Sequence, residues 1–568
     1  MRLFNLSNLQ FVQLIFAAAG LVACSDKKNN EQIITEINNL DLTRGDIALC
    51  SSRDGEFGTV SLNLSCSDKV RANMNLGTAL LHSFEYTEAE KVFAKVIDED
   101  PRCVMAYWGV AMSNFHPLWE VPAEDELKKG ERVIALARSL TTGKSFRESD
   151  YLEAIGAFYE HWDSLDHSTR VNKFVTASEN VYKKYPEDTE AAIFYALALR
   201  AAADPKDKTF EKQKNAGNIL TSILEKNPNH PGISHYIIHT FDYPELATLA
   251  LPAARKYAAI AASSAHAQHM PSHIFTRLGL WDEGIQSNLN SVTAAKCYAE
   301  NVGMKGHWDE ELHGLDYLLY GYLQKADDQK AAEQIKYLKS IDVIFPQSSK
   351  VAYSMAAMPT RYALERKNWK DASELTLNSS TLPWEKFPWE KANIHFGRIL
   401  GAVHLKKTDL ARKELKALQD IYSKLAETKQ TYKANVVDIQ IKAAEGWIAW
   451  SKGKEDDAIA LMKQAADMED ATEKHPVTPG EVIPARELLG DLYLTIGQHA
   501  NALNAYESDL KRHPNRFNGL YAAGMACEKL NDHTNAAKFY QNALDLTEGS
   551  SSERPEIIHA RSFVATNN

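Results

Sequence analysis

The sequence predicts an all-α solenoid of repeated helical pairs, and two observations lead to that prediction. Three positions near the C-terminus recur with a period of about 34 residues, since Gly490, Ala502 and Tyr506 are followed by Gly524, Ala536 and Tyr540. A glycine lets two helices cross closely, and the tyrosine fills the gap beside it. The composition agrees, since 44% of the 568 residues are hydrophobic, 24% are charged, and glycine and proline are sparse. Such a period is typical of stacked helix-turn-helix units.

The same pattern begins near the N-terminus. One unit contains Gly77, Ala89, Phe93 and Pro101, and Ala111 and Ala123 repeat its first two positions one period later. Weaker units surround Pro186, Tyr195, Pro228, Ala331, Ala372, Ala411 and Ala458. Between about residues 124 and 188 the period slips, which predicts extra helices there, one of them over residues 151–162. The pattern resembles the tetratricopeptide repeat (TPR) family, and this resemblance implies a tetratricopeptide-repeat superhelical solenoid over most of the chain.

These patterns divide the chain into four parts. Residues 1–24 are a leader, and residues 25–66 are a polar tether with a possible disulfide loop. Residues 67–480 are the main solenoid, and residues 481–568 hold two regular repeats and a tail. The last boundary follows a loop between Glu469 and Pro484, where prolines and a glycine interrupt the helical pattern.

The leader has the features of a signal peptide. Arg2 precedes an apolar stretch from Phe11 to Ala23, which is short for a membrane-spanning helix. The stretch ends in Leu-Val-Ala-Cys, which resembles the lipobox of bacterial lipoproteins. This resemblance implies that Cys24 is acylated and anchors the protein in the bacterial cell envelope, on the periplasmic face or in the outer membrane. The alternative is an ordinary cleaved signal peptide, in which Cys24 carries no lipid.

Export would place the other cysteines in an oxidising compartment. Cys50 and Cys66 flank a turn-rich segment, so a disulfide between them is the first expectation. Cys66 with Cys103 is the alternative pair, because both begin the first helices of adjacent repeats. Cys527 lies where a repeat helix faces its core, and we expect it to be a buried free thiol.

Two histidine pairs carry the clearest indication of function. His235 and His239 are four residues apart, and His269 and His273 repeat this spacing one period later in the chain. Residues four apart share one face of a helix, and residues one repeat apart occupy equivalent faces of neighbouring helices. We therefore expect all four to line the concave groove of the solenoid. Three further residues are predicted at the same groove: His266, His313 and Asp316.

Neutral imidazole is a preferred ligand of zinc and copper. The four paired histidines are therefore predicted to converge on one divalent transition metal, with Asp316 as a ligand or as a carboxylate that orients one. Two alternatives remain: the histidines hydrogen-bond a peptide or small polar ligand, or they pack helix against helix. Pro271, between His269 and His273, is expected to kink its helix.

The predicted function is a membrane-anchored repeat protein that binds a protein, peptide or small ligand in its groove. The alternative is a metal-dependent enzyme, for which Glu310 and Glu311 are the nearby candidate bases. Neither histidine pair has the glutamate of a zincin motif, and the sequence contains no GxSxG motif and no P-loop. A net charge of -11 without basic stripes argues against a nucleic-acid partner.

Beyond its repeats, the chain resembles a group of large exported bacterial TPR lipoproteins of undefined function. The similar segments are Leu-His-Ser-Phe at residues 81–84, Ala-Tyr-Trp-Gly at 106–109 and His-Met-Pro-Ser-His-Ile-Phe at 269–275. The resemblance implies a fold and a location but no reaction. The chain is less similar to the glycan-binding lipoproteins of Bacteroidetes, whose long irregular insertions it lacks.

Overall fold

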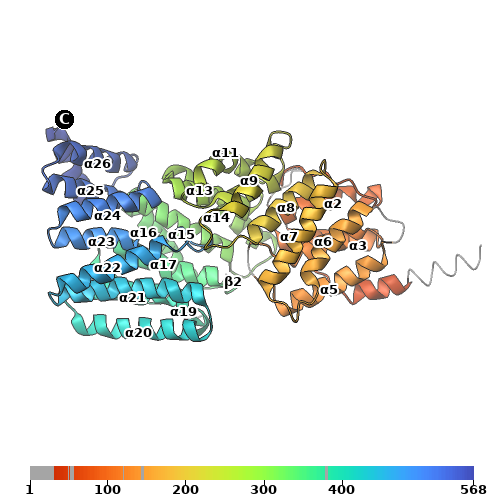
Figure 1. Ribbon diagram of the computed structural model, residues 1–568, viewed down its shortest axis with the longest axis horizontal. Coiled ribbons are helices and arrows are strands. Elements are labelled where there is room, and N and C mark those ends of the chain that lie inside the picture. The colour runs from red at the N-terminus through yellow and green to blue at the C-terminus, as the bar shows by residue number, and fades with distance from the viewer. Residues whose placement is uncertain are drawn as a thin grey trace, which may run out of the picture. The chain divides into compact units, whose positions relative to one another are not determined.

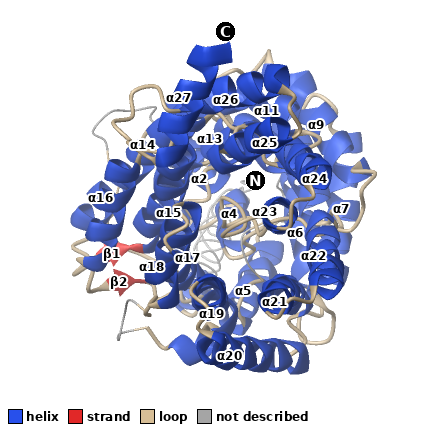
Figure 2. Cartoon of the chain, turned by 90° about the vertical axis from the view of Figure 1, so that its left-hand side faces the viewer, coloured by secondary structure: helices blue, strands red, loops and turns tan. Residues whose placement is uncertain are grey.

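The computed structural model describes residues 31–48, 50, 57–118, 121–141, 146–377 and 382–567. The predicted leader and Cys24 lie outside these residues. The described chain is almost entirely α-helical, which confirms the predicted fold class (Figure 1). Within it, the strands are two short segments, β1 (His307–Trp308) and β2 (Ile344–Phe345), which pair in parallel (red in Figure 2). No helix in this part of the chain is both long and apolar enough to cross a membrane.

The chain divides into two compact units. The first consists mainly of residues 58–203 and 212–232, and the second of residues 233–568 together with 48–57 and 204–211. The helical elements of the first unit are η1 (Asp68–Val70), α2 (Arg71–His82), α3 (Tyr86–Glu99), α4 (Val104–Ser113), α5 (Glu124–Ser139), α6 (Phe146–Tyr159), α7 (His167–Lys184), α8 (Thr189–Ala201) and α9 (Glu211–Leu224). The extra helices expected where the period slips are α5, α6 and α7.

The second unit begins within α10 (Pro231–Phe241) and contains the histidine pairs. Its first helices are α11 (Ala247–Ile260), α12 (Ala265–His269), α13 (Pro271–Leu278), α14 (Trp281–Asn301), α15 (Asp309–Gln324), α16 (Asp328–Lys339), α17 (Ser349–Glu365) and α18 (Trp369–Ser373). The later elements are η2 (Trp384–Lys386), α19 (Pro388–His404), α20 (Thr408–Glu427), α21 (Thr431–Ser451), α22 (Glu455–Asp470), α23 (Ala485–Thr495), α24 (His499–Arg512), α25 (Phe517–Lys529), α26 (His533–Leu546) and α27 (Pro555–Asn567). The loop between Glu469 and Pro484 lies inside this unit.

The small residues of the repeat act as the sequence indicates. A Cβ atom added at Gly490 of α23 would lie 2.5 Å from Cε1 of Tyr506 on α24. The same relation holds between Gly524 and Tyr540, where the distance is 2.6 Å. Both tyrosine rings are fully buried. Paired helices therefore cross at glycine because no larger residue fits between them. In Figure 1, α20 to α26 follow one another as stacked layers of such pairs.

Part of the segment predicted as a polar tether is folded. Residues 31–38 form a helix, and Ile33, Ile37 and Leu40 are buried. The isoleucines are four residues apart, so they share one apolar face that packs within the first unit. Polar residues surround this face in the sequence, so the segment resembles a tether although part of it is helical.

The favoured disulfide is wrong and the alternative is correct. Cys66 pairs with Cys103, with their Cα atoms 4.9 Å apart. Cys50 pairs with Cys297 of α14, whose Cα atom lies 5.7 Å away. The spacing of Cys50 and Cys66 suggested a local loop, but the chain between them leads from one unit to the other. Cys527 is free and fully buried, as predicted.

Candidate metal centre

The histidine region is built from short helices with defined ends. Ser264 caps α12 by accepting the backbone N–H of Ala267 at 3.0 Å. Pro271 occupies the first turn of α13, where its missing N–H costs nothing, and Gly279 ends that helix in the left-handed conformation. At the predicted kink, α12 ends at His269 and α13 begins at Pro271. Met270 between them keeps right-handed helical dihedral angles, so the two histidines of the second pair stay on consecutive helical turns.

Three histidines form what we call the first triad: His235 and His239 of α10 and His266 of α12. Nε2 of His235 lies 3.1 Å from Nε2 of His266 and 3.1 Å from Nε2 of His239. The ring of Tyr257 stacks on His235, with 5.0 Å between the ring centroids. One ligand atom from each histidine lies within 4.8 Å of the other two. The three rings therefore present nitrogen atoms to one small space.

Three more histidines form the second triad: His269 of α12, His273 of α13 and His313 of α15. Nε2 of His269 lies 3.0 Å from Nε2 of His273, and the ring centroids of His269 and His313 are 4.1 Å apart. Ligand atoms of all three again lie within 4.8 Å of one another. The triads are neighbours, because His266 and His269 belong to one helical turn and the rings of His239 and His273 are 6.4 Å apart.

This arrangement corrects the predicted single site. The two i, i+4 pairs do not converge on one point, because each pair is completed by a histidine from another helix, His266 or His313. Nor do the histidines line an open groove. His239 is partly buried, and the side chains of the other five are 0–5% exposed. The rings of Tyr257 and Tyr317 pack against His235 and His269, respectively.

The hydrogen bonds of His269 determine which ring nitrogen carries its proton. Asn288 donates its Nδ2–H to the carbonyl of Gly284 at 2.8 Å, so its Oδ1 must face Nδ1 of His269, 2.6 Å away. An amide oxygen only accepts, so Nδ1 of His269 is the donor. Nε2 of the neutral ring then carries a lone pair.

The ring proton of His273 is likewise on Nδ1. Its Nδ1 lies 2.9 Å from the carboxylate of Asp242. Burial alone would raise the pKa of Asp242, but the charges of Lys474 and Arg277 hold it well below its ordinary value. The carboxylate is therefore ionised and accepts the Nδ1–H of His273. Nε2 of His273 carries a lone pair that faces the lone pair of His269.

A proton on one of the two Nε2 atoms would remove the repulsion between the lone pairs, but burial disfavours it. Burial lowers the pKa of His269 well below its ordinary value, and the charge of a protonated His273 would lower it further. Burial likewise lowers the pKa of His273 despite its bond to Asp242, and it lowers those of His266 and His313 strongly. These four imidazoles are neutral near pH 7 and can act as metal ligands. A carboxylate–histidine pair aimed at a shared point is the usual outer support of a bound metal.

The carboxylates singled out from the sequence do not support either triad. Asp316 is buried in an ion pair with Arg361, which also donates to the carbonyl of Gly480 at 2.8 Å. Glu310 bonds Lys350 at 2.5 Å. Glu311 accepts from Tyr337 at 2.6 Å and lies 2.8 Å from Nδ1 of His307. These side chains hold helices together, so neither glutamate is positioned as a catalytic base at the histidines.

The residues that orient the second triad were missed in the sequence. Asp242 follows α10 by one residue, and Asn288 lies on α14, far from both pairs in the chain. Tyr317 packs against His269 with ring centroids 4.5 Å apart and donates its hydroxyl to the carbonyl of Thr478 at 3.0 Å. None of these positions follows the repeat period, and the repeat period is the feature of the sequence that indicates the two histidine pairs.

The first unit contains a further buried cluster. Glu190 bonds Nε2 of His82 at 2.9 Å with one oxygen and Nε2 of His230 at 2.8 Å with the other. Burial would raise the pKa of Glu190, but these two histidines lower it far below its ordinary value. Here the ring nitrogens point at a carboxylate rather than at one another. The two Nε2 atoms of this cluster are therefore already bonded to the carboxylate, while Nδ1 of His230 has no partner among the described residues.

Comparisons with known proteins agree with the repeat architecture. Tetratricopeptide repeat family models match residues 70–103 and 487–551. No curated protein matches the chain. The chain is similar to the solved structure "Human IFIT1 dimer with m7Gppp-AAAA", with 13% identity, a TM-score of 0.35, and coverage of 85% of this chain and 96% of that one. It is also similar to "Human IFIT1 dimer with PPP-AAAA", with 14% identity, a TM-score of 0.36 and the same coverage. The identities and TM-scores of these structures are too low to indicate what this chain binds.

Proposed function

We propose that this tetratricopeptide-repeat protein binds two transition-metal ions, one in each histidine triad. The observation that carries the proposal is the 3.0 Å approach of the Nε2 atoms of His269 and His273. Both atoms carry lone pairs, because both Nδ1 atoms donate to acceptors. Two facing lone pairs repel each other unless a cation lies between them, and burial disfavours a proton there. A metal ion removes the repulsion.

The distances support this proposal. Histidine nitrogens bind zinc at about 2.0–2.1 Å, so two ligands of a tetrahedral ion lie roughly 3.3 Å apart. The Nε2 pairs at 3.0 and 3.1 Å require a shift of only a few tenths of an ångström to reach this separation. Three neutral imidazoles suit copper and zinc, and copper binds such sites more tightly. Three protein ligands also leave a coordination position open for a ligand from outside.

Metal analysis tests this proposal. Untagged protein, loaded with copper or zinc and passed through a desalting column, should retain two ions per chain. His235→Ala with His239→Ala should remove one ion, and His269→Ala with His273→Ala should remove the other. His533→Ala is the control, because His533 is exposed and belongs to neither triad. Circular dichroism should confirm that the variants stay helical.

Several outcomes would refute two independent sites. Retention of metal by both double variants would place it elsewhere. Loss of both ions in each double variant would indicate one shared site. Wild-type protein that retains no metal would leave the histidines as a packing cluster.

We also propose that the protein is lipid-anchored through Cys24 and works at the bacterial cell envelope. The support is the lipobox-like tetrad at residues 21–24. Cys24→Ala should leave the protein either unprocessed, with its leader still attached, or soluble, because no acyl chain can be added without the thiol. Cys527→Ala is the matched control, because that thiol is buried inside the fold. A Cys24→Ala protein that matures normally and stays with membranes would contradict the anchor.

A further inference from the structure

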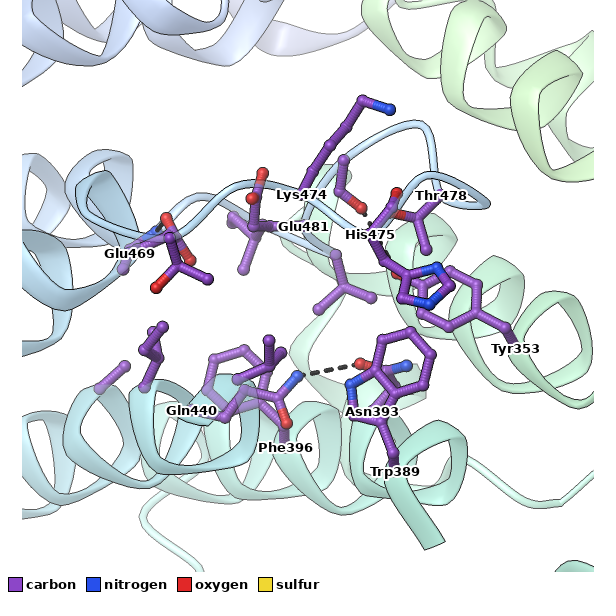
Figure 3. Close-up of a pocket in the computed structure, with 18 of the residues that line it drawn as sticks. Tyr353, Trp389, Asn393, Phe396, Gln440, Glu469, Lys474, His475, Thr478 and Glu481 are labelled. Atoms are coloured by element: carbon purple, nitrogen blue, oxygen red, sulfur yellow. Dashed lines mark hydrogen bonds between the residues drawn. The ribbon is translucent and has the colours of Figure 1, made fainter. Parts of the chain in front are cut away.

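A cavity lies between α19, α21 and the loop over residues 471–484 (Figure 3). Its volume of about 50 Å³ exceeds the roughly 10–15 Å³ that one buried water needs, so a small group of several heavy atoms fits inside. Aromatic side chains form much of its wall: Tyr353, Trp389, Phe396, Tyr432 and His475. The ring centroid of Trp389 lies 5.2 Å from that of Tyr353 and 5.1 Å from that of His475. The faces of such rings attract positive charge.

Three carboxylates belong to the same lining: Glu469, Glu473 and Glu481. Glu473 bonds Lys208 through Oε1, while its Oε2 has no hydrogen-bond partner among the described residues and lies 3.9 Å from Arg277. Glu481 lies 3.3 Å from Nε2 of His513. Burial would raise the pKa of Glu481, but the hydrogen bond and charge of His513 lower it far below its ordinary value. These two carboxylates therefore have positive groups beside them.

Glu469 has no such positive partner. It is 7% exposed, and its Oε1 accepts the backbone N–H of Ala485 at 2.6 Å. Among the described residues, none donates a hydrogen bond to Oε2, and this oxygen retains accessible surface, unlike Oε2 of Glu473. Burial and the negative charge of Glu481 raise the pKa of Glu469 well above its ordinary value, although Ala485 and His513 oppose the shift. A positive charge in the cavity would stabilise ionised Glu469.

We propose that this cavity binds the ammonium group of a small protonated amine. An ammonium group has three N–H donors, and Oε2 of Glu469 offers an acceptor that no described residue uses. The aromatic rings attract the charge. The apolar part of the wall, which includes Val436, Ile439 and Ile483, suits a short alkyl chain. An anion would be repelled by the carboxylates, and a metal ion would find few oxygen ligands among aromatic walls.

The basic residues near the cavity do not supply this charge. Lys474 extends away from the aromatic side chains in Figure 3 and donates to Asp242 at 3.2 Å. Lys433 does not belong to the lining; its Nζ lies 3.4 Å from Glu390 and 5.1 Å from the ring centroid of Trp389. His475 is neutral near pH 7, because burial lowers its pKa to about 4. The contact of Lys433 also shows that this aromatic wall accepts an ammonium group.

The neutral polar side chains of the lining have partners of their own. Asn393 and Gln440 bond each other at 2.9 Å, and their remaining amide atoms have almost no accessible surface. The hydroxyl of Thr472 donates to the carbonyl of Met468 at 2.7 Å and accepts from Asn435 at 2.9 Å. These groups are therefore not needed by the occupant, and Glu469 is the polar group that selects it.

Saturation-transfer NMR with propylammonium at pH 7 tests the proposal on the full chain. Propylammonium should give a signal. Propionate should not, because the carboxylates repel it, and 1-propanol should not, because it has no charge. Nα-acetyl-lysine methylamide and its norleucine counterpart then distinguish the source of the ammonium group. If the ligand is a lysine side chain, only the lysine compound displaces propylammonium. If neither displaces it, the ligand is a free small amine.

Glu469→Gln is the decisive variant. Its amide oxygen can still accept from Ala485, but without the charge it should bind propylammonium about tenfold more weakly or worse, at an unchanged Tm. Glu427→Gln is the control, because Glu427 of α20 is exposed and lies outside the lining. The signal should persist in the His269→Ala/His273→Ala variant, which separates this proposal from the metal proposal.

Two results would overturn the amine site. The absence of a propylammonium signal would mean that a proton alone neutralises Glu469. Equal affinity in Glu469→Gln and the wild type would mean that the amine binds elsewhere.

Discussion

Asp242 accepts the Nδ1–H of His273 at 2.9 Å with one carboxylate oxygen and the Nε–H of Arg277 at 2.8 Å with the other. This relationship fixes the proton on Nδ1 of His273 and directs its Nε2 lone pair toward His269. Asp242 thus controls the chemistry of the second triad without contacting the space that a metal would occupy.

Replacing Asp242 by Asn should weaken metal binding at the second triad by about 10–100-fold, as is typical for residues that orient a ligand. The amide oxygen would face Arg277, so its NH₂ group would face His273 and move the ring proton to Nε2. Titration against a chromophoric chelator measures the effect. His533→Ala is the control, since His533 is exposed and belongs to neither triad. Equal weakening of both triads would contradict this assignment.

The pH dependence of stability should include a contribution from His513. Burial would lower its pKa, but Asp509 and Glu481 outweigh burial and raise it to about 10. A raised pKa means that the folded state holds the proton more tightly than the unfolded state. The stabilisation is therefore complete below about pH 6.5 and is lost as the pH rises toward 10. The Tm difference between wild type and His513→Gln should shrink over that range. A constant difference would exclude this contribution.

The Cys66–Cys103 disulfide should stabilise the first unit. Its residues are 37 positions apart, and closing a loop of this length contributes about 4 kcal/mol in the chain-entropy model. The Cys66→Ala/Cys103→Ala variant should unfold at lower urea concentration than oxidised wild type. A reducing agent should lower the stability of the wild type by more than that of the variant, which keeps only the Cys50–Cys297 disulfide. An unchanged wild-type midpoint under reducing conditions would argue against the bond.

Gly490→Ala should lower the free energy of unfolding by about 1–3 kcal/mol, because the added methyl group overlaps the buried ring of Tyr506. Gly284→Ala is the control. Its Cβ would meet only Phe275 at 3.7 Å, and alanine favours the helix. Urea denaturation measures both. Combining Gly490→Ala with Tyr506→Leu should cost less than the sum of the single changes, and strict additivity would contradict a direct clash.

The repeat could be predicted from the sequence because its contacts join residues that are close together in the chain. Gly490 and Tyr506 meet within one helical pair, so their spacing alone reports the contact. The histidine pairs were found for the same reason. The grouping of the histidines into two triads could not be predicted, because His313 and Asn288 reach the second triad from other helices. Asp316 forms an ion pair with Arg361 instead of contacting a triad. Cys50 and Cys297 likewise meet only through the three-dimensional fold.

The most direct test of the central claim is an anomalous-scattering map of crystals soaked with copper or zinc, recorded at the absorption edge of the metal. The metal proposal predicts two separate peaks. One should lie about 2.0–2.1 Å from Nε2 of His235, His239 and His266, and the other at the same distance from nitrogens of His269, His273 and His313. The absence of peaks at the histidines, or a single peak shared by His235, His239, His269 and His273, would contradict it.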